Sequence, residues 1–340
     1  MSSLPILYII SNDKFYNEKY LNHNDLGSVI NCFQNNFRIN IIARSTKRKF
    51  KFLVLQNKIQ FLNFFSIKTI NNIRLADKKA KFLFISLTPF NLINYLLIKF
   101  FLRKKNFYLY LRSNGFKEYE IIFGYLGKLF YHLMLRLVIN NVKLIISSSD
   151  LRYNKKKFNL IQPSELDPEW FDNQLIARVP KKIKFIYLGR FKKEKGIKDF
   201  IELINSTKLN FELKVYGLDS LKNFSNTKRI NYYPQIFDKK KIINIYDKAN
   251  IFILPSFTES NPKVIWESLA RLRPVIVFDD IKHVVKNKIG VYVSKRNITS
   301  LIKTVNFIIN NYKLIQLQIK NNNFPLKKNF EKDFVHILKK

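Results

Sequence analysis

The sequence is poor in cysteine and glycine, and it lacks long apolar runs. A single cysteine, Cys32, excludes an internal disulfide framework and favours the reducing cytoplasm. Glycine occurs 8 times in 340 residues, and no G-x-G-x-x-G follows the first expected strand, so the usual dinucleotide-binding fingerprint is absent. No segment offers about 20 uninterrupted apolar residues, so a membrane-spanning helix is not expected.

Acidic residues are also scarce, with 24 Asp and Glu against 61 Lys and Arg, which leaves a net charge of +37. Such basic proteins bind nucleic acid, anionic lipid surfaces or phosphorylated ligands. The charge is spread evenly over both halves of the chain, unlike a dedicated nucleic-acid surface, so we expect no nucleic acid partner. The abundance of Lys, Asn, Ile and Phe, typical of an AT-rich genome, offers a compositional explanation for part of the charge.

The length predicts two domains, and 47% hydrophobic residues can supply a core for each. The start, MSSLPILYII, has no basic segment before its short apolar stretch, so we expect a first core strand and not a signal peptide. Three prolines and a cluster of acids in 161–180 resemble an interdomain linker. The expected division is an N-terminal domain at 1–165, a linker at 166–180, a second domain at 181–325, and a C-terminal helix or tail at 326–340.

Both halves alternate between short apolar runs and segments of helical periodicity, which is typical of a parallel α/β fold. In the first half we expect strands at Ile6–Ile10, Ile39–Ala43, Phe52–Gln56, Phe82–Ser86, Phe107–Leu111 and Leu144–Ser147, and helices at Leu26–Asn36, Asn91–Arg103 and Tyr119–Ile139. In the second half we expect strands at Ile183–Leu188, Glu212–Tyr216, Ile251–Leu254, Val275–Phe278 and Gly290–Val293, and helices at Ile197–Asn205, Lys239–Ala249, Lys263–Arg271 and Ser300–Lys320.

The most hydrophobic expected helix, Tyr119–Ile139, carries Lys128, His132 and Arg136 as one polar stripe at i, i+4 and i+8. Two interpretations stay open. The helix is a buried packing helix with one edge in solvent, or it rests on an anionic membrane surface with its basic residues toward lipid phosphates. The nearby stretch Leu96–Lys105 ends in a basic triplet beside aromatic residues, which suits either anionic lipid or a helix C-terminus.

Three polar stretches of the second half follow expected strands, at the sheet edge where open parallel sheets bind ligands. In YLGRFKKEKG (187–196), Arg190 and Lys195 suit contact with phosphate, although an ordinary basic loop is the plain alternative. In KVYGLDS (214–220), Gly217 would let the backbone pass close to a ligand.

The third stretch, 251–278, places two carboxylates eight residues apart. Glu259 is expected in a loop and Glu267 about one turn into a helix, so both could flank one ligand. The segment Ser260–Lys263 would present backbone N–H groups at the helix start, an anion site by geometry. The plain alternative is a helix-cap acid and a solvated helix residue.

Taken together, GR-x3-EKG, a strand ending in YG, and E-x7-E followed by SLA-x3-PVI resemble family 4 of the retaining glycosyltransferases, of bacterial surface-polysaccharide type. The resemblance is strong over 183–295 and looser in the first half. It implies two Rossmann-like domains facing across a cleft (the GT-B fold), with the acceptor held by the first domain and the nucleotide sugar by the second.

The resemblance also implies roles for individual residues. Arg190 and Lys195 would hold the donor diphosphate, Glu267 would bind the ribose hydroxyls, and Glu259 would act as the catalytic residue near the transferred sugar. The remaining donor-binding residues would be Gly217, Ser260, Asn261 and Lys263. None of the four histidines, His23, His132, His283 and His336, is assigned a catalytic role.

These roles need no cofactor and no metal, because two cations and helix N–H groups can stabilise a departing nucleoside diphosphate. The absence of an Asp-x-Asp motif near the second-half motifs agrees with metal independence. The expected partners are a nucleotide-sugar donor, a glycan or polyprenyl-linked acceptor, and an anionic membrane surface at the inner face of the plasma membrane. Two alternatives remain: a nucleotide-sugar 2-epimerase of the same fold, and a non-catalytic protein that binds anionic surfaces.

Overall fold

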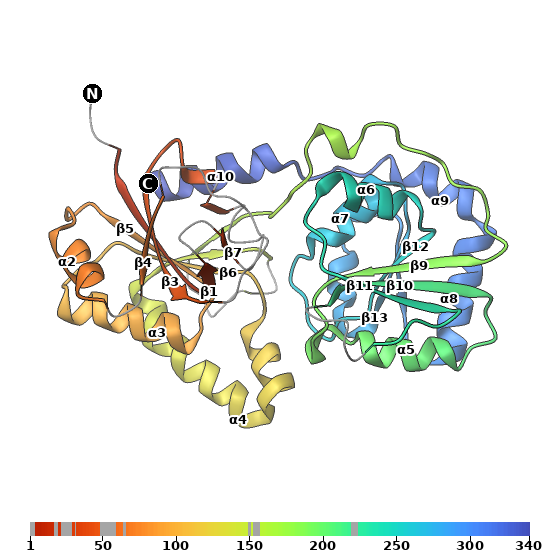
Figure 1. The fold of residues 1–340 in the computed structure, drawn as a ribbon, viewed down its shortest axis with the longest axis horizontal. Coiled ribbons are helices and arrows are strands. Elements are labelled where there is room, and N and C mark those ends of the chain that lie inside the picture. Colours follow the sequence, from red (N-terminus) through yellow and green to blue (C-terminus); the bar gives the residue numbers. More distant parts are fainter. Residues whose placement is uncertain are drawn as a thin grey trace. The chain divides into compact units, whose positions relative to one another are not determined.

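The computed structural model describes residues 4–16, 20–21, 29–30, 32–47, 59–63, 66–148, 151, 157–218 and 224–340. The chain divides into two compact units (Figure 1). The first unit comprises residues 1–163 together with 328–340, and the second comprises 164–327. Each unit contains a parallel β-sheet with helices packed on it.

In its described pairings the first sheet is parallel, except for the short strand β2 (Tyr20–Leu21), which pairs antiparallel with β1. Across the sheet the strands are β4 (Ile59–Asn63), β3 (Arg38–Ser45), β1 (Ile6–Tyr16), β5 (Lys81–Ile85), β6 (Phe107–Leu111), β7 (Lys143–Ile146) and β8 (Phe158–Leu160). The described helices of this unit include α2 (Ile67–Leu75), α3 (Pro89–Leu96) with a π-helical turn η1 (Leu97–Phe101), α4 (Gly115–Val138) with a 3-10 turn η2 (Ile139–Asn141), and α10 (Lys327–Lys339).

Successive side chains of β1 point to opposite faces of the sheet, and both faces are buried. Leu7 and Ile9 belong to the core on the face covered by α10. Tyr8 and Ile10 belong to the core on the other face, with side chains of α3 and α4. The unbroken apolar strands of the sequence follow from this double burial.

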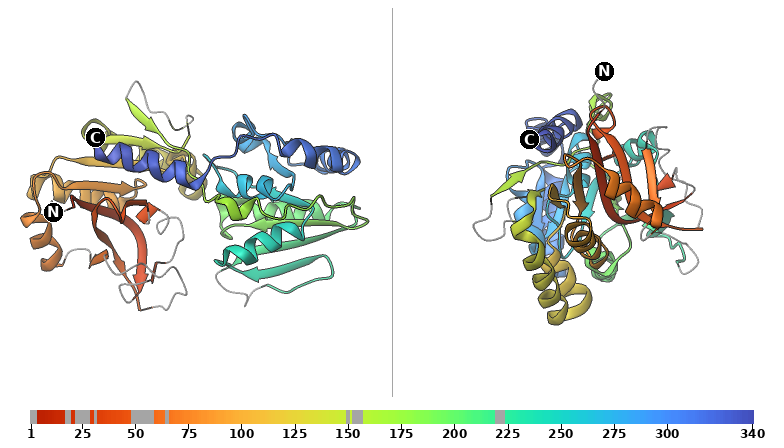
Figure 2. Two further views of the ribbon diagram at one scale, coloured as in Figure 1. Left: turned by 90° about the horizontal axis from the view of Figure 1, so that it is seen from above. Right: turned by 90° about the vertical axis from the view of Figure 1, so that its left-hand side faces the viewer.

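The C-terminal helix α10 completes the core of the first unit. Phe330, Phe334 and Leu338 recur at i, i+4 and i+8 and are buried together. The ring of Phe334 lies 4.9 Å from that of Phe33 and 5.0 Å from that of Tyr110, centroid to centroid. Figure 2 shows α10, the blue helix next to the C-terminus, lying with the strands of the first unit.

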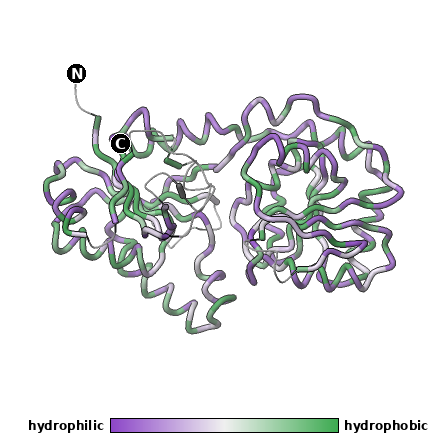
Figure 3. Tube along the Cα trace, in the orientation of Figure 1, coloured by the Kyte–Doolittle hydropathy of each residue, from purple (hydrophilic) through white to green (hydrophobic). Residues whose placement is uncertain are grey.

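Helix α4 is a hairpin of two helical arms that reverse at Gly124, where φ is +72° and ψ is −164°. Phe116 and Tyr131, which would be about 22 Å apart along a straight helix, have ring centroids only 4.9 Å apart. An ion pair of 3.1 Å between Lys128 and Glu120 also joins the arms. Hydrophobic residues recur along both arms (Figure 3).

The second sheet is parallel in all its described pairings. Across it the strands are β11 (Ile230–Pro234), β10 (Phe211–Leu218), β9 (Ile183–Leu188), β12 (Ile251–Leu254), β13 (Val275–Phe278) and β14 (Val291–Ser294). Its helices are α5 (Ile197–Asn205), α6 (Lys239–Asp247), α7 (Lys263–Ala270), α8 (Ile298–Asn310) and α9 (Tyr312–Ile319), with 3-10 turns η4 (Pro168–Trp170), η5 (Lys193–Lys195) and η6 (Asp279–Val285).

The stretch expected as a linker packs into the second unit, where two buried arginines hold it. Arg271 donates to both carboxylate oxygens of Asp247 at 2.8 and 2.9 Å, and to the backbone carbonyls of Trp170 and Asp172 at 3.0 and 2.7 Å. Arg273 donates to the carbonyl of Leu175 at 3.0 Å. These contacts satisfy the guanidinium groups of two arginines that are almost fully buried.

The expected strands that lie within the described residues are confirmed. The expected strand Phe52–Gln56 lies outside the described residues, as do His23 and residues 26–28 and 31 of the expected helix Leu26–Asn36. Other expectations are wrong. The first strand, expected to end at Ile10, continues through Ser11–Tyr16 as β1. Ser300–Lys320 forms two helices, α8 and α9, interrupted at Asn311. Tyr119–Ile139, expected as one helix, reverses at Gly124 within α4.

Candidate functional site

The polar loops of the second unit follow β9, β10 and β12, which are neighbours in the sheet. Their closest approach is at two glycines. Gly217 has a φ of +119°, and a Cβ placed on it would lie 1.9 Å from the carbonyl oxygen of Gly189. A residue with a side chain at this position would force the two loops apart. The sequence motifs around Gly189 and Gly217 are therefore brought together at one sheet edge.

Gly196 makes the matching contact with the loop after β12. It has a φ of +58°, and a Cβ there would lie 2.2 Å from the carbonyl oxygen of Pro255. The backbone N–H of Phe257 donates to the carbonyl of Glu194 at 3.0 Å. The loops carrying Lys195 and Glu259 are thus held together by backbone contacts as well as by side chains.

Lys195 and Glu259 form an ion pair, with 2.6 Å between Nζ and Oε1. The hydroxyl of Ser256 donates to the same oxygen at 2.7 Å. Only 18% of the lysine side chain and 13% of the glutamate side chain are exposed, so water screens the pair weakly. His283 anchors the same residue, with Nε2 lying 2.9 Å from the carbonyl oxygen of Glu259.

Tyr187, in β9, supports the loop that follows this strand. Its hydroxyl donates to the carbonyl of Arg190 at 2.8 Å. Burial raises the pKa of the Tyr187 hydroxyl, and the negative charge of Glu259 raises it further. The hydroxyl therefore keeps its proton and remains a donor. The Arg190 side chain itself is exposed, with its nearest acid, Glu194, at 3.9 Å.

Glu267 lies on α7, and one of its oxygens, Oε2, accepts a hydrogen bond of 3.1 Å from the hydroxyl of Tyr246. Burial raises the pKa of Tyr246, and the charge of Glu267 adds to the effect. A protonated tyrosine thus orients the carboxylate from the protein interior. At the start of the same helix, Lys263 donates to Glu165 at 2.9 Å.

The loop before α7 also contains buried hydroxyl groups. The Oγ atoms of Thr258 and Ser260 are shielded from solvent and, among the described residues, have no hydrogen-bond partner. Pro262 occupies the N-cap of α7 and makes no side-chain cap, so the first backbone N–H groups of the helix are not capped by it. Asn261 lies between these features and is half-buried.

The structure thus brings Gly189 to Gly217 and Lys195 to Glu259. Arg190 and Lys263 make separate contacts, with Glu194 and Glu165. Sequence reasoning did not find Ser256 or Arg296. The guanidinium carbon of Arg296 lies 4.0 Å from the ring centroid of Phe257, and its NH2 donates to the carbonyl of Pro255 at 2.7 Å. No local pattern signals these residues, because their role arises from contacts between separate loops.

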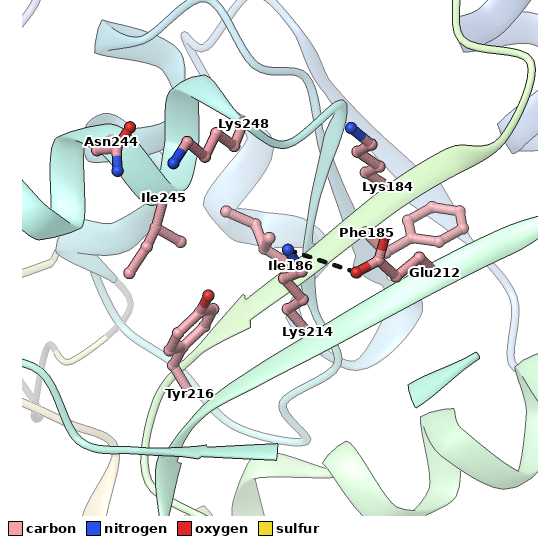
Figure 4. Close-up of a pocket in the computed structure, with 9 residues that line it drawn as sticks. All are labelled: Lys184, Phe185, Ile186, Glu212, Lys214, Tyr216, Asn244, Ile245 and Lys248. Carbon is pink, nitrogen blue, oxygen red and sulfur yellow. Dashed lines mark ion pairs between the residues drawn. The ribbon is translucent and has the colours of Figure 1, made fainter. Parts of the chain in front are cut away.

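A separate pocket lies between β9, β10 and α6 (Figure 4). Its lining is basic at three positions and includes the ion pair between Lys214 and Glu212, at 3.4 Å. Burial raises the pKa of Tyr216, at one end of the pocket, to about 12. The residues that line it are Lys184, Phe185, Ile186, Glu212, Lys214, Tyr216, Asn244, Ile245 and Lys248. None of the residues assigned from the motifs lines this pocket.

Solved structures with the same fold cover nearly the whole chain at low identity. HepE from Anabaena, in complex with UDP and glucose, aligns with a TM-score of 0.69 and 11% identity over 99% of each chain. Sucrose-phosphate synthase from Thermosynechococcus elongatus aligns at 0.65 and 14%, over 98% of this chain and 94% of that chain. WaaG, a glycosyltransferase involved in lipopolysaccharide biosynthesis, aligns at 0.64 and 11%, over 98% and 95%.

These likenesses define the class of fold, an α/β protein with two Rossmann-like domains of the GT-B type, and confirm the predicted fold class. Within it, residues 169–323 match the family model of glycosyl transferases group 1. No curated protein sequence matches the chain. The family match supports a glycosyltransferase and does not favour the epimerase or the non-catalytic alternative.

Proposed function

We propose that the protein is a retaining, metal-independent glycosyltransferase of family 4 that transfers a sugar from a nucleotide-sugar donor to a glycan acceptor. The observation that carries the proposal is the shielded pair of Lys195 and Glu259, beside the contact of Gly189 with Gly217. It places a cation, a carboxylate and closely packed backbone at the carboxyl end of a parallel sheet, where α/β folds bind ligands.

In this proposal the donor diphosphate replaces Glu259 as the partner of Lys195. Arg190 supplies a second cation, and the backbone N–H groups at the start of α7 supply neutral donors. These groups stabilise the negative charge that develops on the departing nucleoside diphosphate, and they do so without a metal or other cofactor. Among the described residues, no group of three or more His, Cys, Asp or Glu could hold a metal ion.

The two carboxylates take different parts in the reaction. Glu259, released from Lys195, faces the transferred sugar and stabilises positive charge at its anomeric carbon in the transition state. Glu267, oriented by Tyr246, accepts hydrogen bonds from the ribose hydroxyls. Gly217, Ser260, Asn261 and Lys263 complete the donor site, with the buried hydroxyl of Ser260 as a donor or acceptor for the ligand.

The donor and acceptor classes are also proposals. HepE has been solved with UDP, with UDP and glucose, and with UDP-glucose, which supports a uridine nucleotide sugar as donor. The role of WaaG in lipopolysaccharide biosynthesis supports a lipid-linked surface glycan as acceptor. We place the reaction in the cytoplasm, at the inner face of the plasma membrane, since the high net charge suits a diphosphate-linked acceptor.

The proposal is tested by assaying sugar transfer or donor hydrolysis with a panel of UDP-, GDP- and ADP-sugars. Lys195→Ala should lower kcat/KM about a hundredfold or more, the usual effect of losing one donor to a developing charge. Lys193→Ala, which removes an exposed lysine from the same loop, is the matched control and should retain activity. Equal activity of the two variants would discard the diphosphate contact.

A second measurement separates binding from chemistry. Glu267→Ala should weaken the affinity for the nucleotide sugar in calorimetry, while Glu259→Gln should retain affinity and lose turnover. Unchanged affinity of Glu267→Ala would remove the ribose role, and full turnover of Glu259→Gln would remove the catalytic role.

A further inference from the structure

The tip of the α4 hairpin is an exposed apolar surface of the first unit. Phe123 and Leu126, on either side of the reversal at Gly124, are 65% and 76% exposed. Tyr125 between them is 73% exposed. From Ile121 to Gly127 the chain carries no polar side chain except the hydroxyl of this tyrosine. Large apolar side chains in a protein core are not this accessible to solvent. An exposed apolar patch of this kind marks a contact surface.

The second arm of the hairpin continues this surface. Leu129, Leu133 and Leu137 recur at i, i+4 and i+8, and each is about half exposed. A neighbouring stripe on the same arm carries Lys128, His132 and Arg136, whereas a third stripe is buried against the sheet. The arm therefore has a buried face, an exposed apolar face and a basic edge between them.

The hairpin is folded for lying on a membrane and not for crossing one. By length and composition, Gly115–Asn141 could span a bilayer, and only 28% of its most apolar window is buried. The reversal at Gly124 leaves arms of about nine and fourteen residues, each shorter than the roughly 20 residues that a span requires. Two close contacts stabilise the reversal. A Cβ at Gly115 would lie 2.1 Å from the Tyr131 ring, and a Cβ at Gly127 would lie 2.4 Å from the carbonyl oxygen of Tyr119.

The charges of the hairpin favour an anionic lipid surface over a neutral one. Between Tyr125 and Val138 there is no acidic residue, and the charged side chains are Lys128 and Arg136. The acids of the first arm are engaged within the fold, because Glu120 pairs with Lys128 at 3.1 Å and Glu118 accepts from Ser113 at 2.7 Å. Aromatic and aliphatic side chains beside basic ones are the composition of interfacial helices.

We propose that the α4 hairpin is a membrane-docking element, which inserts Phe123, Tyr125 and Leu126 among the acyl chains of an anionic bilayer and sets Arg136 against lipid phosphates. The proposal goes beyond the proposed function, because docking requires neither the donor nor the acceptor. A vesicle-binding assay without substrates therefore fails or succeeds independently of the assignment of the reaction.

The experiment measures sedimentation of the full chain with phosphatidylcholine vesicles, with and without phosphatidylglycerol. The wild type should bind the anionic vesicles. The double variant Phe123→Ser with Leu126→Ser should bind about a hundredfold more weakly, roughly tenfold for each lost side chain. The matched control, Phe307→Ser with Leu314→Ser, removes a phenylalanine and a leucine of comparable exposure from α8 and α9 and should bind as the wild type does.

Arg136→Gln tests the electrostatic part. It should weaken binding to anionic vesicles about fivefold, the usual effect of one charge near such a surface, and should leave binding to neutral vesicles unchanged. Tyr125→Trp supplies a spectroscopic readout, because indole fluorescence shifts to shorter wavelength when the tip enters the bilayer. Phe307→Trp should show no such shift.

Three results would overturn the proposal: no binding of the wild type to either kind of vesicle, equal binding of the tip variant and its control, or no shift for Tyr125→Trp. Light scattering tests a second copy of the chain as the alternative occupant. A wild-type dimer that fails to bind vesicles, and that becomes monomeric in the tip variant, would assign the surface to self-association instead.

Discussion

Strand β1 lies between β3 and β5 in the first unit, and β9 lies between β10 and β12 in the second. After β9 the chain turns at once at Gly189, and the following loops close on one another through glycine contacts and a shielded ion pair. β1 instead continues past a register shift to Tyr16 and pairs with β2. Two sheets of similar topology therefore end differently, and the compact polar edge belongs to the second.

The two units also use their apolar side chains differently. Helix α7 in the second unit buries Ile265, Trp266 and Leu269, whereas α4 in the first unit exposes its tip and one face. In the second unit, close backbone contacts and buried side chains leave little space for a larger side chain. In the first unit, part of the apolar surface of α4 is exposed to solvent. We expect matched substitutions to cost more in the second unit, and this expectation can be tested pair by pair.

The largest difference in the free energy of unfolding is expected between substitutions of two arginines, one in each unit. Arg271→Ala should lower the free energy of unfolding by about 3–5 kcal/mol, because it leaves Asp247 and several buried carbonyls without their donor. Arg136→Ala, which removes an exposed arginine from α4, should change it by no more than about 0.5 kcal/mol. Urea unfolding of both variants checks the contrast, and equal losses would contradict it.

The second comparison is between substitutions of two glycines with positive φ, Gly217 in the second unit and Gly124 in the first. Gly217→Ala should lower the free energy of unfolding by more than about 3 kcal/mol, because backbone strain adds to a clash with the carbonyl of Gly189. Gly124→Ala should lower it by about 1–2 kcal/mol, since a Cβ there meets nothing within 4 Å. Thermal or chemical denaturation measures both, and a larger loss for Gly124→Ala would refute the comparison.

The third comparison is between two ion pairs, one in each unit. A double-mutant cycle on Lys195 and Glu259, read by chemical denaturation, should report a coupling of about 1–2 kcal/mol. The same cycle on Lys128 and Glu120, whose side chains are 44% and 42% exposed, should report about 0.3 kcal/mol. A coupling as small for the first pair as for the second would mean that solvent screens both.

The smallest expected effect concerns Lys288, whose pKa burial lowers from 10.5 to about 8. The folded state disfavours the charged amine, so wild-type stability should rise as the pH increases from 8 to about 10.5, where the unfolded chain still holds the proton. Lys288→Met should therefore be more stable than the wild type by about 1 kcal/mol at pH 7, less than the full shift implies, because local relaxation reduces the penalty. This advantage should fade toward pH 10.5.

Denaturation curves across this pH range measure the effect. Lys99→Met in the first unit is the control, because Lys99 also lies 5.0 Å from an aromatic ring centroid, and it shows what the contact alone contributes. An advantage of Lys288→Met that does not change with pH would contradict the prediction.

The sequence could predict the sheets because strands buried on both faces are unbroken apolar runs, as in Ile251–Leu254. It did not reveal β11 (INYYP), whose side chains are half-buried and partly polar. It also did not reveal the reversal in α4, since helical periodicity continues on both sides of Gly124 and the contacts that stabilise the turn join residues about fifteen positions apart.

The candidate site likewise contains residues that the sequence could predict and residues that it could not. The ends of predicted strands indicated Lys195, Gly217 and Glu259, because parallel strands present their carboxyl ends at one edge. Ser256 and His283 could not be assigned, since each acts through a contact with Glu259 that depends on how the loops pack. Local pattern thus predicted these positions, and the tertiary structure shows which side chains contact them.

The return of α10 to the first unit has a consequence for synthesis of the chain. The first sheet needs Phe330, Phe334 and Leu338 to close one of its two cores, and the ribosome releases these residues after all 164 residues of the second unit. The second unit can therefore finish folding while the first still exposes an open apolar face. Until α10 has been synthesised, that face is a natural binding site for chaperones, and a ribosome stalled before Lys327 would leave it uncovered.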